Sequence, residues 1–250
     1  MNSLEDSISN SLDSQNSDIL PFISYLLQDF WQIGTPFDDI YKLIKNNIKD
    51  PSNIKVLDLG CGKGAISIQL AQKFNCKCHG IDGLEDFIEF SKMKSKKLKV
   101  DHLTTFTTGD IREEIKKLPK FDLIILGATG PIFENYLIAI SKLSSILNEN
   151  GFIIISDAYS NDNFKYISKN ELFNQVNKAD FKVIDEIMDN NEIFIEDFNK
   201  EYALIEKRSL ELINKYPDKK DLFIDFLNGQ KEEYDDLKDL TGITFIIARN

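Results

Sequence analysis

Short apolar runs and stretches of helical spacing alternate along the middle of the chain. The runs predict strands near residues 55–59, 77–81, 103–107, 123–126, 152–156, 181–187 and 243–248. Helical spacing falls between them at 65–74, 85–97, about 111–116, 133–147 and 171–179. Strands that alternate with helices predict a parallel sheet joined by right-handed crossovers. We therefore expect an α/β fold, with a doubly wound sheet as the middle of three layers.

The two ends of this pattern differ from its middle. Residues 1–18 are mostly polar and predict a disordered or loosely attached tail, and residues 19–50 predict a helical arm. Within the arm, Thr35 followed by Pro36 predicts a helix start, with a capping hydroxyl ahead of a first-turn proline. Residues 51–189 would form the core. Residues 190–240 predict a helical insertion, in which Pro217 separates two amphipathic helices, and 241–250 hold the last core strand.

A glycine-rich segment follows the first predicted strand directly. It reads Asp58-Leu-Gly-Cys-Gly-Lys-Gly64 and leads into the helix predicted from Ala65. Glycine is needed where backbone touches a ligand or takes a positive φ. The helix start adds free N–H groups and partial positive charge. A strand, a glycine turn and a helix in this order predict one side of a nucleotide-type pocket.

Asp58 distinguishes between two families that use this layout. Gly60, Gly62 and Ala65 satisfy the loose dinucleotide pattern, but Asp58 would repel a pyrophosphate there. S-adenosylmethionine (SAM) instead carries an ammonium and a sulfonium, which a carboxylate favours. The segment 58–64 resembles the first motif of class I, Rossmann-like, SAM-dependent methyltransferases, acidic-x-G-x-G-x-G. A tight turn without a ligand and an NAD-dependent oxidoreductase are the alternatives.

The resemblance covers about residues 50–190 and 241–249, and it implies a mostly parallel seven-stranded sheet whose last strand inserts antiparallel beside the sixth. It also implies SAM as cofactor. Asp82 would bind the ribose hydroxyls and Asp110 the adenine amino group, although either could instead cap a helix. The implied cofactor residues are Asp58, Gly60, Cys61, Gly62, Gly64, Asp82, Gly83, Leu84, Asp110, Ile111 and Gly127.

The acceptor site is less well marked in the sequence. Asp157, Tyr159 and His102 are candidates for a base, if the acceptor needs one, with a non-catalytic polar role as the alternative for each. Segment 126–131 lacks the Asn/Asp-Pro-Pro-aromatic motif common in nucleic-acid amino methyltransferases. Aromatic residues of the arm and insertion predict a lid, with core packing or a dimer interface as alternatives. The candidate substrate residues are Tyr25, Trp31, Thr129, Tyr159, Phe198 and Tyr202.

Composition narrows the choice of partner. The formal net charge of -11 and a pI of about 4.8 argue against nucleic acid and against an anionic membrane surface. Three cysteines without framework spacing favour a reducing compartment, and no metal site is expected. No run of ~20 apolar residues or signal-peptide layout is present, so we expect a cytoplasmic protein.

The sequence thus predicts a SAM-dependent methyltransferase with a small-molecule acceptor. A protein or tRNA methyltransferase of the same fold is one alternative. A SAM-binding sensor or partner subunit without turnover is another, because no obvious base stands out. The oligomeric state is left open, with a homodimer as one alternative.

Overall fold

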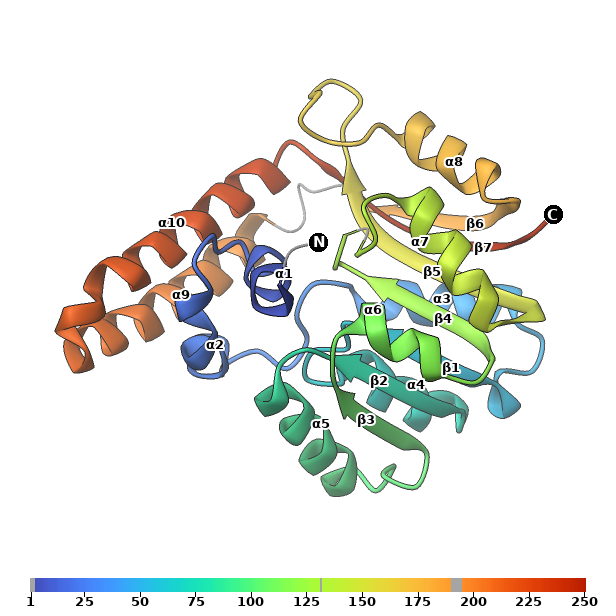
Figure 1. The fold of residues 1–250 in the computed structure, drawn as a ribbon, viewed down its shortest axis with the longest axis horizontal. Helices are drawn as coiled ribbons and strands as arrows, with labels where there is room; N and C mark the ends of the chain where they lie inside the picture. The colour runs from blue at the N-terminus through green and yellow to red at the C-terminus, as the bar shows by residue number, and fades with distance from the viewer. Residues whose placement is uncertain (1–2, 131, 190–194) are drawn as a thin grey trace. The chain divides into compact units, whose positions relative to one another are not determined.

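The structure is a computed structural model that describes residues 3–130, 132–189 and 195–250. The chain divides into two compact units. The helical unit comprises Met1–Phe30 and Asn190–Thr241, and the sheet unit comprises Trp31–Asp189 and Gly242–Asn250. Figure 1 labels the elements of both units.

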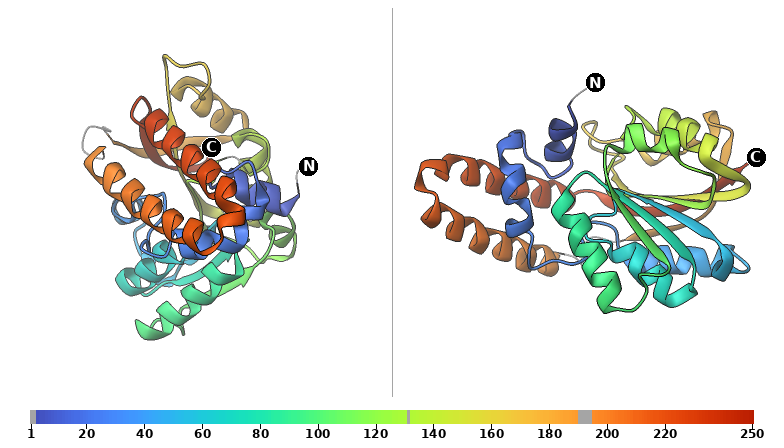
Figure 2. Two further views of the ribbon diagram at one scale, coloured as in Figure 1. Left: turned by 90° about the vertical axis from the view of Figure 1, so that its left-hand side faces the viewer. Right: turned by 60° about the horizontal axis from the view of Figure 1, so that its bottom comes forward.

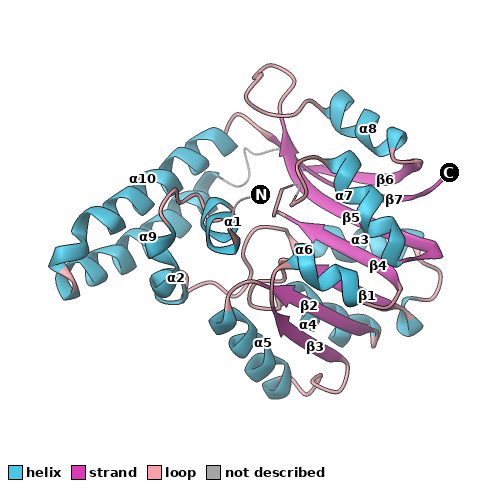
Figure 3. Ribbon diagram, viewed as in Figure 1, coloured by secondary structure: helices cyan, strands magenta, loops and turns pink. Residues whose placement is uncertain are grey.

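The sheet unit contains a seven-stranded mixed sheet in the order β3-β2-β1-β4-β5-β7-β6 (Figures 1 and 3). Neighbouring strands from β3 across to β5 pair in parallel, whereas β6 and β7 pair antiparallel. The α/β fold and the antiparallel last strand are therefore confirmed. The strands are β1 Lys55–Leu59, β2 Lys77–Asp82, β3 Thr104–Thr108, β4 Phe121–Gly127, β5 Leu147–Tyr159, β6 Phe181–Asp189 and β7 Thr241–Arg249.

Helices cover both faces of this sheet because successive strand residues point to opposite sides. Val56 packs with the cluster that includes residues of α3 and α4, whereas its neighbour Leu57 packs with residues of α7 and α8. Figure 2 shows these helices on the two sides of the strands. The helices of this unit are α3 Phe37–Asn47, α4 Ala65–Phe74, α5 Glu85–Lys97, α6 Ile111–Glu114, α7 Tyr136–Leu143 and α8 Lys169–Lys178.

The helical unit combines the N-terminal residues and the first part of the predicted arm with the predicted insertion. Its helices are α1 Leu4–Asn10, α2 Leu20–Leu26, α9 Ile195–Lys215 and α10 Lys220–Leu237, and a 3-10 turn at Pro217–Lys219 separates the last two. Phe223 and Phe226 of α10 and Ile205 of α9 are buried, and Phe22 of α2 packs edge-on against Phe223. Helices α9 and α10 thus bury apolar faces within their own unit. None of the helices in the described ranges is both long and apolar enough to span a bilayer.

The N-terminal segment differs from the predicted disordered tail. Ser3 caps α1 by accepting a hydrogen bond from Asp6 N at 3.0 Å, and Ser9 and Ser14 are buried. Gln230 of α10 donates to Leu12 O at 3.0 Å. Polar composition suggested disorder, but small serine side chains can cap helices and pack closely against a neighbouring helix.

The predicted arm also divides differently from the prediction of 19–50. Its second helix, α3, belongs to the sheet unit, where Phe37, Ile40 and Ile44 are buried against strands and α4. The helix starts after Pro36, which holds the N-cap position, so Thr35 lies one residue too early to cap it. The predicted capping role of Thr35 is therefore wrong.

Gly229 gives a test of the packing in the helical unit. A Cβ at this position of α10 would overlap the carbonyl oxygen of Asp13. The N-terminal backbone can therefore lie this close to α10 only because residue 229 has no side chain. We expect Gly229→Ala to lower the local free energy of unfolding by about 1–2 kcal/mol, because extra atoms in a packed contact force backbone shifts. Amide hydrogen exchange in α9 and α10 should accelerate accordingly, while exposed Asn228→Ala should leave it unchanged. Equal exchange in both variants would contradict the close approach.

Candidate cofactor site

The predicted cofactor residues gather at the carboxyl edge of the sheet. Strand order runs outward in opposite directions from the adjacent pair β1 and β4, which makes this pair the switch point of the sheet. Gly60 follows β1, Asp82 ends β2 and Gly127 ends β4. Ligands of open α/β sheets bind at the carboxyl ends of strands beside a switch point. The topology therefore brings these three residues, distant in sequence, to the place where a ligand is expected.

The glycine turn has the left-handed backbone that its sequence requires. Gly60, Gly62 and Gly64 have φ values of 71°, 51° and 70°. The N–H groups of Gly60 and Cys61 both donate to Ile81 O, at 2.9 and 3.0 Å, which ties the turn to the end of β2. Gly64 holds the N-cap position of α4. Three positive φ angles in five residues account for the alternate glycines, because other residues adopt this region at a cost.

Asp82 connects the glycine turn to the start of α5. Its carboxylate accepts hydrogen bonds from Gly62 N at 2.8 Å and Leu84 N at 2.9 Å. Burial raises the pKa of Asp82, and backbone N–H bonds from Leu84, Gly62 and Gly83 partly offset this. Each carboxylate oxygen has a second lone pair. Asp82 can therefore organise the turn and still accept a hydroxyl of a ligand.

Asp58 lies behind the glycine turn with little exposure. Its side chain accepts a hydrogen bond from Ser67 Oγ of α4 at 2.7 Å, and the residue is 3% exposed. Burial raises its pKa from 3.8 to about 6; the bond from Ser67 lowers it, and the nearby Asp82 carboxylate raises it further. Two carboxyl groups thus share a poorly solvated region. A cation bound there would stabilise their ionised forms.

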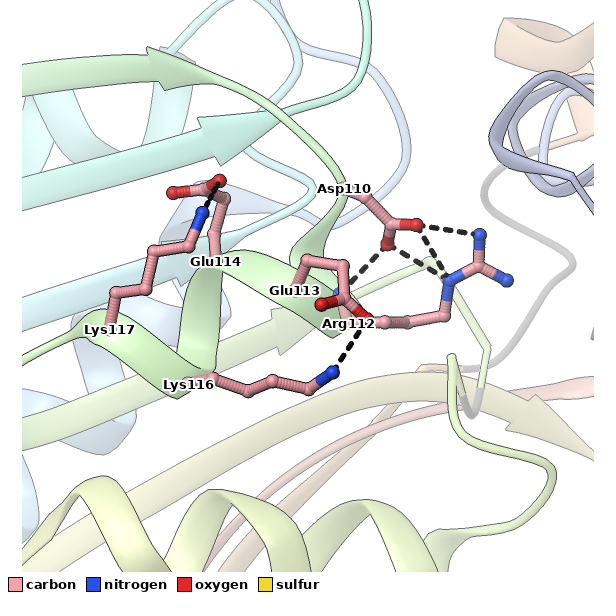
Figure 4. A network of polar contacts seen from close by, with 6 residues as sticks. All are labelled: Asp110, Arg112, Glu113, Glu114, Lys116 and Lys117. Atoms are coloured by element: carbon pink, nitrogen blue, oxygen red, sulfur yellow. Dashed lines mark hydrogen bonds and ion pairs between the residues drawn. The ribbon is translucent and has the colours of Figure 1, made fainter.

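Asp110 is engaged with Arg112, as Figure 4 shows. The carboxylate caps α6 by accepting from Arg112 N at 2.9 Å, and it accepts from Arg112 Nε and Nη2 at 2.9 and 2.8 Å. These bonds lower the pKa of Asp110. A bond to an adenine amino group would have to share an oxygen that already accepts from Arg112. Ile111, the first residue of α6, follows directly.

The segment before α3 packs onto the same edge of the sheet. Trp31 Nε1 donates to Lys63 O in the glycine turn at 3.1 Å, and Lys94 Nζ lies 4.4 Å from the centre of the Trp31 ring. Trp31, predicted as a substrate residue, therefore braces the glycine turn. The methyl group of Thr129 occupies the space that a Cβ on Gly60 would need. The segments after β1 and β4 are thus in direct contact.

At the end of β5, Asp157 is paired with a residue that the sequence did not indicate. Tyr136, the first residue of α7, donates its hydroxyl to Asp157 Oδ2, while Oδ1 accepts from Ala158 N at 2.7 Å. Burial raises the pKa of Asp157 and raises that of Tyr136 well above its usual value. Tyr136 had no motif of its own, and only its position after the β4 loop could have marked it.

Of the other two candidate bases, His102 is placed differently from the prediction, whereas the role of Tyr159 stays a prediction. His102 is exposed in the turn before β3, at the amino end of a strand that runs parallel to β2. It therefore lies at the edge of the sheet opposite the glycine turn, so its prediction as a catalytic residue is wrong. Tyr159 is 7% exposed within the apolar cluster beside α7 and α8, and its hydroxyl lies 3.5 Å from Met188 Sδ.

The remaining predicted substrate residues belong to the helical unit. Tyr25 donates its hydroxyl to Glu211 at 2.7 Å, and Phe198 and Tyr202 both pack against the ring of Tyr234. Burial and the Glu201 carboxylate raise the pKa of Tyr234. The predicted lid over the acceptor remains a prediction.

A family model described as a methyltransferase domain matches residues 50–227, more than half of the chain. The chain belongs to this methyltransferase family. The predicted family is therefore confirmed, and with it SAM as the cofactor. The assignment of the glycine turn to this cofactor stays a prediction.

Individual relatives cover the chain only in part. A probable cobalt-precorrin-6B C(15)-methyltransferase (decarboxylating) of Methanococcus maripaludis is 33% identical over 113 residues, 43% of this chain and 60% of the relative. A ubiquinone biosynthesis O-methyltransferase of Pelagibacter ubique is 26% identical over 58% of this chain and 66% of the relative. The chain thus spans less than two thirds of the length of these curated relatives.

Solved structures share the fold of the chain over most of its length. A SAM-dependent methyltransferase from Geobacter sulfurreducens, in complex with S-adenosyl-L-homocysteine (SAH), has a TM-score of 0.74 at 17% identity. The similarity covers 92% of this chain and 98% of that one. At this identity the likeness establishes the fold.

The pair of Tyr136 and Asp157 gives a second testable prediction. We expect Tyr136→Phe to lower the free energy of unfolding by about 1–2 kcal/mol, because it leaves a buried carboxylate oxygen without its donor. Denaturant unfolding at pH 7 measures the loss. In an Asp157→Asn background the loss should be smaller, since no ionised carboxylate remains to be desolvated. Equal losses in both backgrounds would contradict a coupled pair.

Proposed function

We propose that the chain is a SAM-dependent methyltransferase that acts on a small molecule by in-line methyl transfer. The observation that carries the proposal is the glycine turn at the switch point, with two poorly solvated carboxyl groups, Asp58 and Asp82, beside it. A cationic ligand with ribose hydroxyls fits this chemistry, whereas a pyrophosphate does not. In the described ranges, no group of three or more His, Cys, Asp or Glu side chains could hold a metal ion.

The proposed cofactor contacts follow the order of the strands. Gly60, Gly62 and Gly64 would present backbone to the amino-acid portion of SAM, and Asp82 would accept the ribose hydroxyls. Further contacts to the adenosine and the methyl end are assigned to Cys61, Gly83, Leu84, Asp110, Ile111 and Gly127, with Asp110 sharing its oxygens with Arg112.

When bound, SAM supplies a methyl group on a sulfonium, which is already a good leaving group. The contribution of the protein is then chiefly alignment of the acceptor with that methyl group. The residues from Gly127, which ends β4, to Gly130 are small and leave room for an acceptor to approach. Asp157 near the end of β5 is the candidate base, since burial raises the pKa of its carboxyl group and so makes it a better proton acceptor. An acceptor that is already nucleophilic would need no such step.

A small-molecule acceptor is favoured by charge and by the relatives. The net charge of -11 opposes binding to tRNA through phosphate neutralisation. Two relatives are named for a cobalt-precorrin and for ubiquinone biosynthesis, whereas a third is named for release factor glutamine. The three cysteines are free, which supports a reducing and hence cytoplasmic location.

The experiment is a label-transfer assay. Methyl-labelled SAM is incubated with the protein and with a cell extract separated into small-molecule, protein and RNA fractions. We expect label only in the small-molecule fraction, and Asp82→Ala should reduce it. Label in the protein or RNA fraction would contradict the proposed acceptor class. SAH binding without label in any fraction would favour a SAM-binding sensor or partner subunit.

A further inference from the structure

The helical unit carries the whole net charge of the chain. Of the 41 Asp and Glu residues and the 30 Lys and Arg residues, 19 and 8 lie in this unit. The helical unit therefore has a formal charge of -11, and the sheet unit, with 22 residues of each sign, has none. An excess of one sign attracts ligands of the opposite sign. A ligand of the helical unit is therefore expected to be a cation.

Three aromatic rings gather where α9 runs beside α10 (Figure 1). Phe198 and Tyr202 are four residues apart on α9, so they share one face of that helix. Both pack against Tyr234 of α10, with ring centres 5.3 and 6.3 Å away. All three side chains are half-buried, whereas Phe223 and Phe226 deeper in the unit are fully buried. The three rings therefore keep surface that a ligand can reach.

Two carboxyl groups lie beside these rings. The Tyr234 hydroxyl donates to Glu201 Oε2 at 3.1 Å, and the charge of Asp13 also acts on this hydroxyl. Burial raises the pKa of Asp13 from 3.8 to about 6, which a hydrogen bond from Gln230 offsets only in part. Asp13 and Glu201 are both half-buried. A cation bound beside the rings would favour the ionised form of both carboxyl groups.

Gln230 gives a second indication of a ligand. It lies four residues before Tyr234 on α10, so the two side chains share a face of the helix. Gln230 is 8% exposed, and its Nε2 donates to Leu12 O at 3.0 Å and lies 3.4 Å from Asp13 Oδ2. Within residues 3–130, 132–189 and 195–250, no group donates to its Oε1. A nearly buried amide beside Asp13 thus keeps an acceptor to offer.

We propose that this cluster of Asp13, Phe198, Glu201, Tyr202, Gln230 and Tyr234 binds the alkylated ammonium group of a small organic cation. The faces of aromatic rings attract such a group, and the two carboxylates offset its charge. A metal ion fits less well, because no group of three or more His, Cys, Asp or Glu side chains in the described ranges could hold one. All six residues belong to the helical unit, so the site can be tested without SAM.

The test is a titration of the full-length protein, followed by NMR of labelled tyrosine rings. Choline supplies the alkylated ammonium group, and its carbon analogue, with a tert-butyl group in place of trimethylammonium, has the same shape without the charge. We expect choline to shift the Tyr202 and Tyr234 resonances saturably and to bind about tenfold more tightly than the tert-butyl analogue, the scale of a cation–aromatic contact. The resonances of Tyr216, which packs against Phe22, should stay unchanged.

Two variants of the cluster have matched controls in the same unit. Tyr234→Leu should weaken choline binding about tenfold, because it removes the central ring, whereas Tyr216→Leu should bind choline as the wild type does. Glu201→Gln keeps the shape of the side chain and should weaken binding about threefold through the lost charge. Glu211 also accepts a hydrogen bond from a tyrosine hydroxyl, that of Tyr25, so Glu211→Gln is its control and should leave choline binding unchanged.

Three results would overturn the inference. Choline might fail to bind saturably, or it might bind no more tightly than the tert-butyl analogue, which would show an ordinary apolar surface. Equal weakening by Glu201→Gln and Glu211→Gln would show that the net charge of the unit, and not the cluster, holds the cation. The two glutamine variants decide the question even if Tyr234→Leu does not fold, because each changes the charge and keeps the shape.

Discussion

Replacement of Asp82 by alanine should weaken binding of SAH by about 3 kcal/mol, or about 150-fold, the upper end of the range for hydrogen bonds to a charged group. Two effects combine in this variant. The ribose hydroxyls would lose their proposed acceptor, and the N–H groups of Gly62 and Leu84 would lose theirs, so the glycine turn would also lose its order. Isothermal titration of the folded variant measures the change.

Two control variants separate these effects of Asp82. Asp82→Asn keeps one carbonyl oxygen and should fall between wild type and Asp82→Ala. Asp101→Ala removes an exposed aspartate in the turn before β3, at the opposite edge of the sheet, and should bind as the wild type does. Unchanged SAH affinity in a folded Asp82→Ala protein would contradict the assignment of Asp82 to the cofactor.

The second large effect is expected at Asp58. Its ionised carboxylate should lower the stability of the free protein but strengthen binding of the cationic cofactor. The carboxyl pKa is raised by burial from 3.8 to about 6. Each pKa unit corresponds to about 1.36 kcal/mol, so the rise amounts to about 3 kcal/mol. A group whose folded pKa is raised contributes this stability fully below pH 3.8 and loses it as the pH passes about 6. The free protein therefore becomes less stable because of Asp58 between pH 4 and pH 7.

Asp58→Asn removes this titration. The difference in unfolding free energy, wild type minus Asp58→Asn, should fall by about 2 kcal/mol between pH 4 and pH 7, because part of the total is already lost at pH 4. Asp82 also has a raised pKa, but it is present in both proteins. Taking the difference therefore removes most of its contribution to the pH dependence of stability. SAM affinity should be lower in Asp58→Asn, since the cationic ligand loses a buried negative charge behind the glycine turn. A pH-independent difference, or equal SAM affinity, would contradict this electrostatic role.

The sheet unit was predicted well because its local patterns agree with its tertiary contacts. The ends of α4 and α5 match the prediction, and every predicted strand is observed with its ends shifted by a few residues. Period-2 and period-3.6 patterns mark buried faces, and the glycine turn carries its own backbone requirement. The carboxylates at the ends of β1 and β2 could therefore be placed at one edge of the sheet from sequence.

The residues that the sequence misplaced depend on contacts between distant segments. Thr35 resembled a helix cap because a proline follows it, but α3 starts after Pro36, and Thr35 instead packs on Gly127. Tyr136 carried no motif, and its partner Asp157 lies 21 residues away. The N-terminal residues looked disordered because their burial depends on α10, more than 200 positions later in the chain. None of these long-range contacts leaves a local pattern.

Calorimetric titration of the wild-type protein with SAH and, separately, with NAD tests the central claim most directly. The glycine turn with Asp58 and Asp82 predicts saturable binding of SAH at one site per chain and no binding of NAD, because a pyrophosphate would meet two poorly solvated carboxyl groups. Tight binding of NAD without binding of SAH would contradict the account.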